Sequence, residues 1–558
     1  MIAREGRLGL QFDVYSYDYP AMSDNGTLNT LWSQAMVAGF VAAGVKRAVI
    51  SPGSRSTPLA LAILRQSGLI CEVTVDERSA AFFALGIAKA SRRPVLLLAT
   101  SGTAPANWLP AVIEAGQAGV PLILISADRP PELQDCGANQ TVDQINLFGS
   151  HVRACHKLGV PDAGFDPAYL HRLAARVCEQ ASWPHPGPVH LNQPFREPLI
   201  PLGNTPVADV PAKIHLSQPL LSPMPDDIQD ICRVMAGRPG VIVCGQLPEN
   251  DDFSHAVSAL AAQLDCPVLA EPLSNLRFGK HDLSHMAVRY NTWLADSTTR
   301  AQVRPEWVLR FGAYPVTRNL QNYVACAPVQ IVVEPWPSWS DPAQRITHLL
   351  RADPTAFCAA LGTALPEACP AGWQSIFAKY ESEAHSAEPV EHIAAILDLL
   401  PEEHAIFVGN SLAIRQLDTH SGSGKKVLHF YGNRGASGID GNISTAMGIA
   451  AEHGQVVALL GDLTTQHDIG GLALAQGRDV VIVTVNNAGG GIFDLLPQAA
   501  LPEFEKGWRT PQQINFEHAA LCFGLSYARA ENAEALRSAL SNAIGQGGAH
   551  LIELTLKP

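Results

Sequence analysis

The segment 461–493, GDLTTQHDIGGLALAQGRDVVIVTVNNAGGGIF, carries the strongest chemical signal in the chain. Asp462 ends one predicted strand and Asn487 ends the next, with one predicted helix between them. A parallel strand–helix–strand unit brings both strand ends to one edge of the sheet, where open parallel sheets bind ligands. There, a carboxylate, an amide oxygen and the carbonyls of the AGGG run would form a set of hard oxygen ligands. Such a set predicts a Mg²⁺ site that also holds substrate phosphates.

Each half of this pattern also has a simpler explanation. An aspartate at a strand end often caps the following helix, and an Asn-Asn pair often forms a turn. The combination of the two at this spacing favours the ligand site. So do Gly461 and the glycines 489–491, because a glycine backbone can approach a diphosphate closely.

Glu77 is a second candidate for chemistry. It follows the expected strand 73–76 and begins the predicted helix over 78–91, so its carboxylate lies at a helix N-terminus at the edge of a sheet. Residue type alone favours a contact with the helix dipole, worth well under about 1 kcal/mol at an exposed surface. The alternative is a catalytic carboxylate.

Four arginines lie just past predicted strands or in Gly/Ser loops: Arg55, Arg129, Arg415 and Arg434. A single loop arginine is usually solvated or structural. Four of them at the same edge of two sheets, in a chain of formal net charge −13, indicate a local site for carboxylate-bearing ligands.

Strands must position these residues, and strand-like runs recur in three blocks separated by amphipathic stretches of helix length. Continuously apolar strands joined by helices indicate parallel sheets covered on both faces. The expected strands lie at 47–51, 73–76, 95–100 and 122–128, then at 240–245, 267–272, 307–312 and 329–335, and finally at 405–411, 427–433, 456–462, 480–487 and 550–556.

Two linkers, 198–227 and 352–373, separate the three blocks. The sequence therefore predicts an α/β protein of three doubly wound parallel-sheet domains, with bounds at 1–200, 201–370 and 371–558. Periodic structure begins only near Leu28. Residues 1–21 are therefore expected to form a loose extension, and Met22 is an alternative start.

Composition limits the classes of partner. The chain has 558 residues, of which 47% are hydrophobic, so several cores can form and disorder is excluded for the chain as a whole. The excess of 52 acidic over 39 basic residues disfavours nucleic acid and anionic membranes. The 11 cysteines form no CxxC pair, and neither a secretory signal nor an apolar run of the ~18 residues that a membrane helix needs is found. We therefore expect a cytoplasmic protein without membrane insertion.

Segment 461–493 resembles the metal–diphosphate motif of thiamine diphosphate enzymes, which opens Gly-Asp-Gly and closes Asn-Asn. Leu463 stands in place of the second glycine. GDL together with NNxGGGIFxxLP is similar to the family of 2-succinyl-5-enolpyruvyl-6-hydroxy-3-cyclohexene-1-carboxylate (SEPHCHC) synthases of menaquinone biosynthesis. The middle domain resembles that family least. The other similar stretches are SPGSRSTPLALA (51–62), DERSAAFFALGIAK (76–89), TSGTAPAN (100–107), ADRPPELQDCGANQ (127–140), GPVHLNQPFREPL (187–199), FVGNSLAIRQLD (407–418) and NRGASGIDG (433–441).

The resemblance implies thiamine diphosphate and Mg²⁺ as cofactors, with Mn²⁺ as an alternative metal. It makes Glu77 the catalytic carboxylate, which hydrogen-bonds N1′ of the aminopyrimidine and favours the tautomer that removes the C2 proton of the thiazolium. An apolar environment would raise the pKa of Glu77 and suit that proton sharing. The implied metal ligands are Asp462, Asn487 and Gly489. The implied cofactor-binding residues are Glu77, Ser411, Ile439, Asp462, Leu463, Thr464, Asn487, Gly489, Ile492 and Phe493.

The implied substrates are 2-oxoglutarate and isochorismate, both dicarboxylates. The implied reaction is decarboxylation of the first and 1,4-addition of its succinyl unit to the second. The resemblance supports a substrate-binding role for Arg318 only weakly, because Thr317 stands where some relatives have a lysine. The implied substrate-binding residues are Ser54, Arg55, Arg129, Asn139, Gln140, Arg318, Ser411, Arg415, Arg434 and Leu496.

The resemblance also implies a homodimer or a dimer of dimers. In this superfamily the pyrimidine-binding domain of one subunit, here 1–200, faces the diphosphate-binding domain of another, here 371–558. Two other interpretations stay open. One is a different thiamine diphosphate-dependent 2-oxo acid carboligase or decarboxylase, similar to acetolactate synthase, against which the arginines and GDL argue. The other is a nucleotide-binding or catalytically silent module, against which Glu77, Asp462 and Asn487 together argue.

Overall fold

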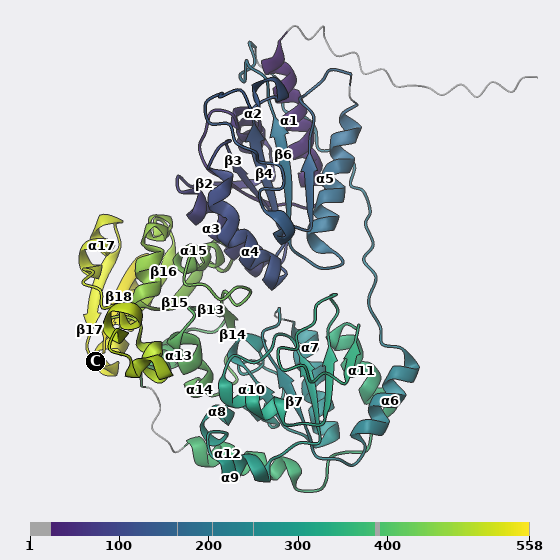
Figure 1. Cartoon of the computed structure of the whole chain (residues 1–558), viewed down its shortest axis with the longest axis vertical. Coiled ribbons are helices and arrows are strands. Elements are labelled where there is room, and N and C mark those ends of the chain that lie inside the picture. Colours follow the sequence, from purple (N-terminus) through teal and green to yellow (C-terminus); the bar gives the residue numbers. More distant parts are fainter. Residues whose placement is uncertain (1–23, 165, 204, 249, 386–390, 557–558) are drawn as a thin grey trace, which may run out of the picture.

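The computed structural model describes residues 24–164, 166–203, 205–248, 250–385 and 391–556 (Figure 1). The expected extension (1–21) and the alternative start Met22 lie outside these residues. Three six-stranded sheets follow one another along the chain, and all their strand pairs are parallel. This confirms the predicted class, an α/β protein of three doubly wound parallel sheets.

The first sheet has the strand order β2-β1-β3-β4-β6-β5. Helices α1, α2 and α5 pack on one face, and α3 and α4 pack on the other. The strands are β1 (Arg47–Ile50), β2 (Ile70–Val73), β3 (Val95–Ala99), β4 (Leu122–Asp128), β5 (Ala154–Lys157) and β6 (Pro188–Pro194). The helices are α1 (Asn25–Ala42), α2 (Thr57–Arg65), α3 (Glu77–Ser91), α4 (Leu109–Ala118) and α5 (Pro167–Ser182), with the short helices η1 (Pro105–Trp108), η2 (Pro131–Leu133) and η3 (Gly149–His151).

The expected strand at 73–76 was wrong in its position. Strand β2 runs over Ile70–Val73 instead, at the edge of the sheet. Val73 and Val75 leave 57% and 82% of their surface exposed, so this stretch has the residue types of a strand without the burial of one. Glu77 therefore begins α3 after a three-residue link, 74–76.

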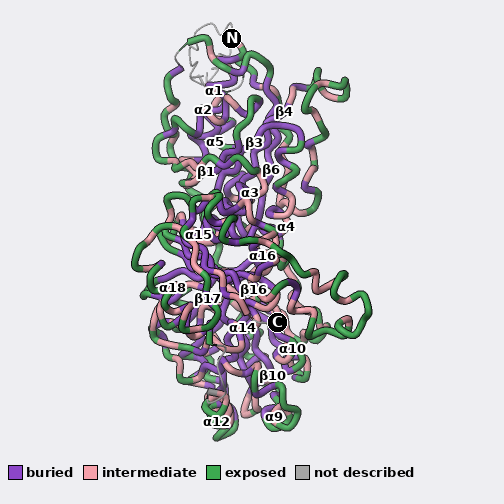
Figure 2. The backbone as a smooth tube through the Cα atoms, turned by 90° about the vertical axis from the view of Figure 1, so that its left-hand side faces the viewer, coloured by how far each residue is buried: buried purple, intermediate pink, exposed green. Residues whose placement is uncertain are grey.

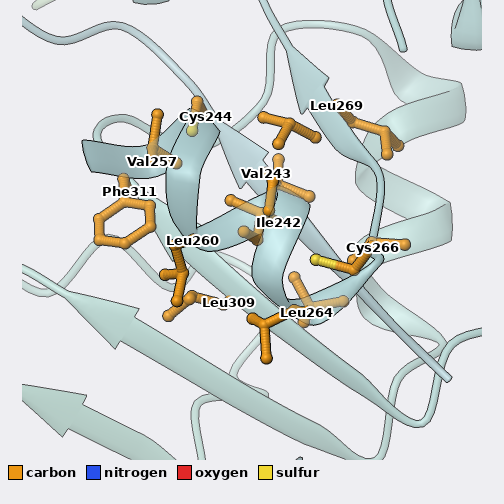
Figure 3. Close-up of a cluster of buried hydrophobic side chains, with 14 of the residues drawn as sticks. Ile242, Val243, Cys244, Val257, Leu260, Leu264, Cys266, Leu269, Leu309 and Phe311 are labelled. Atoms are coloured by element: carbon orange, nitrogen blue, oxygen red, sulfur yellow. The ribbon is translucent and has the colours of Figure 1, made fainter. Parts of the chain in front are cut away.

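The middle sheet has the order β12-β11-β10-β7-β8-β9, which differs from that of the other two. Figure 3 shows its core, where Leu260 of α7 lies with Ile242 of β7 and Leu309 of β10. The strands are β7 (Gly240–Cys244), β8 (Val268–Ala270), β9 (Met286–Ala287), β10 (Trp307–Phe311), β11 (Val329–Val333) and β12 (His348–Leu350). The helices are α6 (Pro225–Met235), α7 (Asp251–Leu264), α8 (Tyr290–Trp293), α9 (Ser297–Gln302), α10 (Arg318–Ala325), α11 (Pro354–Ala364) and α12 (Trp373–His385), with η4 (Pro272–Ser274).

Helix α12 packs against the middle sheet, although the predicted bounds assign it to the third domain. Trp373 and Phe377 belong to the same buried cluster as Ile242. The Glu381 carboxylate accepts hydrogen bonds from the backbone N–H groups of Val288 (3.0 Å) and Arg289 (2.9 Å). These contacts favour a boundary after α12 over one at 370.

The third sheet repeats the order of the first: β14-β13-β15-β16-β18-β17. The strands are β13 (His404–Val408), β14 (Leu428–Tyr431), β15 (Gln455–Gly461), β16 (Asp479–Asn486), β17 (Ser526–Ala530) and β18 (Ala549–Thr555). The helices are α13 (Glu391–Leu399), α14 (Leu412–His420), α15 (Asn442–His453), α16 (Asp462–His467), α17 (Phe516–Cys522) and α18 (Ala533–Gln546), with the short helices η5 (Ile469–Ala475), η6 (Gly491–Leu495), η7 (Pro497–Ala500) and η8 (Glu505–Arg509).

The first and third sheets share one buried core through α3 and α15, which lie side by side (Figure 1). Two glycines allow this close approach. A Cβ on Gly86 would lie 2.1 Å from the Thr445 carbonyl oxygen, and one on Gly448 would lie 2.1 Å from that of Phe83. Along this contact, buried backbone continues from the first domain into the third (Figure 2). The amino and carboxyl thirds of the chain are therefore joined by helix packing as tight as that inside a domain.

Among the described residues, no helix combines the length and the apolar character that crossing a membrane requires.

Candidate functional site

The ends of β15 and β16 meet as the sequence predicts. Gly461 pairs with Val485 in the parallel register, so the residues that follow each strand lie side by side. The Asp462 carboxylate accepts hydrogen bonds from the backbone N–H groups of Gly489 (2.7 Å) and Leu463 (2.8 Å). One carboxylate thus connects the GDL segment to the AGGG loop.

The electrostatics at this edge suit a cation. Asp462 is 5% exposed and forms no ion pair within the described ranges. Burial raises its pKa, against the two backbone hydrogen bonds and the charge of Arg509, which lower it. The side-chain amide of half-buried Asn487 makes no hydrogen bond to a described residue, which leaves its oxygen available. The predicted metal ligands therefore fit a hard divalent cation, since a buried carboxylate and a free amide oxygen lie at one edge.

Gly489 requires glycine for two reasons, its backbone conformation and the space around it. Its φ is +122°, and a Cβ there would lie 2.2 Å from the Arg509 carbonyl oxygen. Its own carbonyl accepts the N–H of Gly491 at 2.8 Å. A second lone pair on that oxygen remains for a metal.

Arg509 holds the same loop, and sequence reasoning missed it. Its guanidinium donates to the Asn487 carbonyl at 2.5 Å and lies 3.5 Å from the Asp494 carboxylate. Its carbonyl accepts the N–H of Gly490 at 2.7 Å. Arg509 lies in η8 within GWRTPQQ, which carries no motif, so only the fold reveals the contact.

Glu77 is the first residue of α3, whose N-cap is the Asp76 side chain. The Glu77 carboxylate is half-buried, and within the described ranges it forms no hydrogen bond or ion pair. Because Asp76 already caps the helix by accepting from the N–H groups of Arg78 (2.8 Å) and Ser79 (3.1 Å), the capping role does not account for Glu77.

Arg78 connects the start of α3 to the third domain, a contact with no signal in the sequence. Its guanidinium lies 3.9 Å from the Asp468 carboxylate and donates to the His467 carbonyl at 3.4 Å. Asp468 is fully buried and accepts the backbone N–H of Ser444 at 2.7 Å. Burial raises the pKa of Asp468 to about 6, against the Ser444 hydrogen bonds and the charge of Arg78.

The predicted substrate residues of the first domain gather beyond β1, β3 and β4. Arg55 is 7% exposed, and its guanidinium bonds the Glu197 carboxylate at 2.9 Å and the Phe195 carbonyl at 3.0 Å. Arg129 donates to the Ser101 hydroxyl, and burial and the charge of Arg55 lower its pKa. The two arginines are thus neighbours, and Arg55 already has a carboxylate partner.

The remaining residues of this group differ in how firmly they are held. Gln140 has a φ of +57°, and its side chain donates to the Ser101 carbonyl at 2.9 Å. Asn139 and Ser54 are exposed. The fold therefore brings these residues to one edge of the sheet, with Gln140 held by hydrogen bonding and the other two open to solvent.

Arg415 and Arg434 lie beyond the ends of β13 and β14. Arg415 donates to the Ser411 carbonyl at 2.7 Å, and Arg434 donates to the Asn410 side-chain oxygen at 2.6 Å. The Arg434 Nε is buried without a partner among the described residues. Burial lowers the pKa of Arg434, opposed by Glu271 and reinforced by the nearby charge of Arg415. Two cations held this close favour an anionic ligand.

A cavity of about 40 Å³ lies behind Arg434, between the middle and third domains. Glu271 and Asp418 line it together with Arg434. Asp418 is fully buried and receives hydrogen bonds from Arg277 (2.5 Å) and from the Tyr290 hydroxyl. Burial and the neighbouring Asp418 raise the pKa of Glu271 to about 8. Sequence reasoning missed this cluster, because AEPLSNLR carries no motif for it.

The other predicted residues lie around the same edges. Arg318 begins α10 and is exposed, whereas Thr317 before it is buried. Leu496 is 40% exposed. Thr464 is buried, and the half-buried members of the set are Ser411, Ile439, Leu463, Ile492 and Phe493.

The chain is similar to known proteins along almost its whole length. Residues 32–147 match the family described as thiamine pyrophosphate enzyme, N-terminal TPP binding domain, and residues 419–554 match the corresponding C-terminal TPP binding domain. The chain is 62% identical to a SEPHCHC synthase of Dechloromonas aromatica, over 96% of this chain and 99% of that protein. It is 39% identical to a SEPHCHC synthase of Geobacillus kaustophilus, over 94% of each chain. It is 38% identical to one of Natronomonas pharaonis, over 94% of this chain and 95% of that protein.

Proposed function

The chain belongs to the SEPHCHC synthase family of thiamine diphosphate enzymes, and we propose that it makes SEPHCHC from 2-oxoglutarate and isochorismate in menaquinone biosynthesis. The C1–C2 bond of 2-oxoglutarate breaks with loss of CO₂. A new carbon–carbon bond then joins its C2 to the ring double bond of isochorismate, which takes up a proton. The observation that supports this most is the convergence of Asp462, Asn487 and Gly489 in a chain so similar to those synthases.

When bound, thiamine diphosphate supplies the carbon nucleophile for the keto group and accepts the electron pair left by CO₂. We assign Glu77 the proton at N1′ of the cofactor's aminopyrimidine. Its carboxylate is half-buried and has no described partner, so it is free to form that hydrogen bond. Proton sharing by a positioned carboxyl group contributes typically about 10²–10⁴-fold to a rate.

Asp462, Asn487 and Gly489 are assigned to Mg²⁺, with Mn²⁺ as the alternative, and through the metal to the diphosphate. Burial of Asp462 strengthens its attraction to a divalent cation, because the surroundings screen the charge less than water does. The other residues assigned to the cofactor are Ser411, Ile439, Leu463, Thr464, Ile492 and Phe493.

The arginines are assigned to the substrate carboxylates, which they bind and orient. Arg434 and Arg415 are the strongest candidates, since burial lowers the pKa of both and neither forms an ion pair with another described residue. The other residues assigned to the substrates are Ser54, Arg55, Arg129, Asn139, Gln140, Arg318 and Leu496.

We further propose a homodimer or a dimer of dimers, in the cytoplasm, with a site completed across the subunit interface. Exposed apolar side chains lie next to both Glu77 and the AGGG loop, as such an interface requires. Val73 and Val75 precede Glu77, and Leu495 (73% exposed) and Leu501 (44% exposed) follow the AGGG loop.

Omission assays test the function. Purified protein is incubated with 2-oxoglutarate, isochorismate, thiamine diphosphate and Mg²⁺, and each component is left out in turn. We expect the loss of isochorismate, with its accompanying CO₂ release, to require 2-oxoglutarate, thiamine diphosphate and Mg²⁺. The second candidate, an acetolactate synthase-like carboligase, predicts CO₂ from pyruvate and none from 2-oxoglutarate. That result would reject the proposed substrates while leaving the cofactor assignment intact.

A further inference from the structure

A buried ion pair of the first domain holds the loop that carries Arg434. We define the Arg434 loop as residues 432–436. Glu114 of α4 accepts the backbone N–H of Gly435 at 2.9 Å and that of Ala436 at 2.6 Å, one on each carboxylate oxygen. Lys89 of α3 donates to the Gly432 carbonyl at 2.7 Å and lies 3.3 Å from the Glu114 carboxylate. Both ends of the loop are thus fixed from another domain.

The burial of this pair shows that it is not an incidental surface contact. The side chains of Lys89 and Glu114 are only 7% and 4% exposed. Removing two charges from water is costly unless their geometry is good and hydrogen bonds satisfy their remaining atoms. Here both Glu114 oxygens and the Lys89 ammonium bond the loop backbone. A Cβ on Gly435 would lie 2.6 Å from the Glu114 carbonyl oxygen, so the loop lies directly on α4.

The loop backbone and the Arg434 guanidinium are held as one unit. The Asn410 side chain accepts from the guanidinium at 2.6 Å and donates to the carbonyls of Asn433 (2.8 Å) and Gly438 (2.7 Å). Displacement of the loop backbone would therefore move the guanidinium with it.

We propose that Lys89 and Glu114 are positioning residues for Arg434, so that the first domain sets the place of a substrate-binding arginine carried by the third. The inference rests on the proposed function for the identity of the ligand. It assigns no contact with substrate to Lys89 or Glu114 themselves. Arginine selects carboxylates by geometry as well as charge, so a small displacement weakens substrate binding more than it slows later steps.

The central variant is Glu114→Gln, which keeps the size of the side chain and removes its charge. We expect KM for the dicarboxylate that Arg434 binds to rise about 10- to 100-fold, while kcat changes less than about threefold. The matched control is Glu452→Gln. It breaks another ion pair between the same two domains, Arg47–Glu452 at 2.5 Å, at the amino end of β1 and therefore at the opposite edge of the sheet. We expect it to leave both KM values unchanged.

A double-mutant cycle separates positioning from general weakening. If Glu114 acts through Arg434, adding Glu114→Gln to Arg434→Ala should raise KM little beyond Arg434→Ala alone. Full additivity of the two effects would contradict the inference. Lys89→Arg should keep the wild-type KM and Lys89→Met should not. Gly435→Ala is the second route if Glu114→Gln folds poorly, because it leaves both charges in place and is expected to raise the same KM.

Hydrogen–deuterium exchange over 432–438 gives a readout that does not need activity. The amides of Gly435 and Ala436 should exchange faster in Glu114→Gln and at the wild-type rate in Glu452→Gln. Unchanged exchange overturns the inference outright. Faster exchange with unchanged KM for both substrates overturns the role of the pair in substrate binding. A wild-type enzyme that consumes neither substrate rejects the proposed function instead, and exchange then decides whether the pair holds the loop.

Discussion

Burial gives similar carboxyl groups different roles in this molecule. Asp462 and Glu271 are 5% and 3% exposed, and the pKa of each is raised, whereas Glu77 is half-buried and has no described partner. Asp462 accepts hydrogen bonds from backbone N–H groups that favour its ionised form, which suits its proposed role as a metal ligand. Glu271 shares its cavity with a second carboxyl group, which favours its neutral form.

Glu77→Gln should lower the rate of CO₂ release from 2-oxoglutarate about 10²–10⁴-fold, because an amide cannot share the proton at N1′. The folded structure and the concentration of thiamine diphosphate for half-saturation should change little. Glu72→Gln is the control, since Glu72 lies on neighbouring β2 and pairs with Arg478 instead. Decarboxylation at the wild-type rate in Glu77→Gln would reject the assigned role.

Glu271→Gln should change how stability depends on pH. The pKa of Glu271 rises from 4.5 to about 8 on folding, because of burial and Asp418, against the Val316 N–H and the charges of Arg277 and Arg434. Between these two pH values the folded chain keeps a proton that the unfolded chain has lost, so this group makes stability fall as pH rises. As the pH rises from about 5 to about 8, the thermal midpoint of the variant should therefore increase relative to that of wild type. A difference between the variant and wild type that does not vary with pH would contradict this.

At the scale of elements, a helix crossing joins the two domains that carry the predicted catalytic and metal-binding residues. Helices α3 and α15 contact each other through glycines, and α3 begins with Glu77. The strand order of the first sheet recurs in the third, so equivalent loops of both domains lie at the carboxyl ends of their strands. The position of Glu77 is therefore fixed by packing with the third domain as well as by its own sheet.

Gly448→Ala should destabilise the protein by about 1–3 kcal/mol or more, because the new methyl group would overlap the Phe83 carbonyl. Thermal or urea unfolding measures this loss. Gly545→Ala is the matched control. Gly545 also lies in a helix, α18, but a Cβ there would meet nothing within 4 Å. Equal midpoints for the two variants would show that the crossing tolerates a wider separation than the structure has.

At the scale of the whole molecule, a single chain leaves apolar residues exposed beside Glu77 and beside the AGGG loop. Val75 is 82% exposed two residues before the predicted catalytic carboxylate. Solvent-exposed valine is common singly, but here it continues with Val73 and Ile70 of β2, which are 57% and 56% exposed. A second copy of the chain is the occupant that the proposed function requires.

Val75→Glu should weaken subunit association by about 3 kcal/mol, or roughly 100-fold, because it places an unpaired charge in an apolar interface. Sedimentation velocity at matched concentrations measures the shift to smaller species. Leu202→Glu changes a residue that is 87% exposed after β6, and it should leave the assembly intact. Identical sedimentation of Val75→Glu and wild type would place the interface elsewhere.

The sequence predicted most of the central strands of the three sheets and missed most of their edge strands. Strands β5, β9, β12 and β17 had no continuous apolar run, and all four are edge strands, with one side unpaired. Strand β6 was missed for another reason. It is fully buried but contains His190, Asn192 and Gln193, whose polar groups are satisfied by hydrogen bonds such as Asn192 to Asp128 at 2.8 Å.

The sequence by itself determined the fold class and the meeting of Asp462 with Gly489, because a strand–helix–strand unit of this length has one favoured arrangement. Only the tertiary structure decided which loop arginines have carboxylate partners and what holds them. Arg55 pairs with Glu197, whereas Arg434 lies on a loop held by Lys89 and Glu114, more than 300 residues earlier in the chain. Contacts so distant in sequence leave no periodicity to detect. The charge state of a group such as Glu271 depends on burial, which exists only once the domains have packed together.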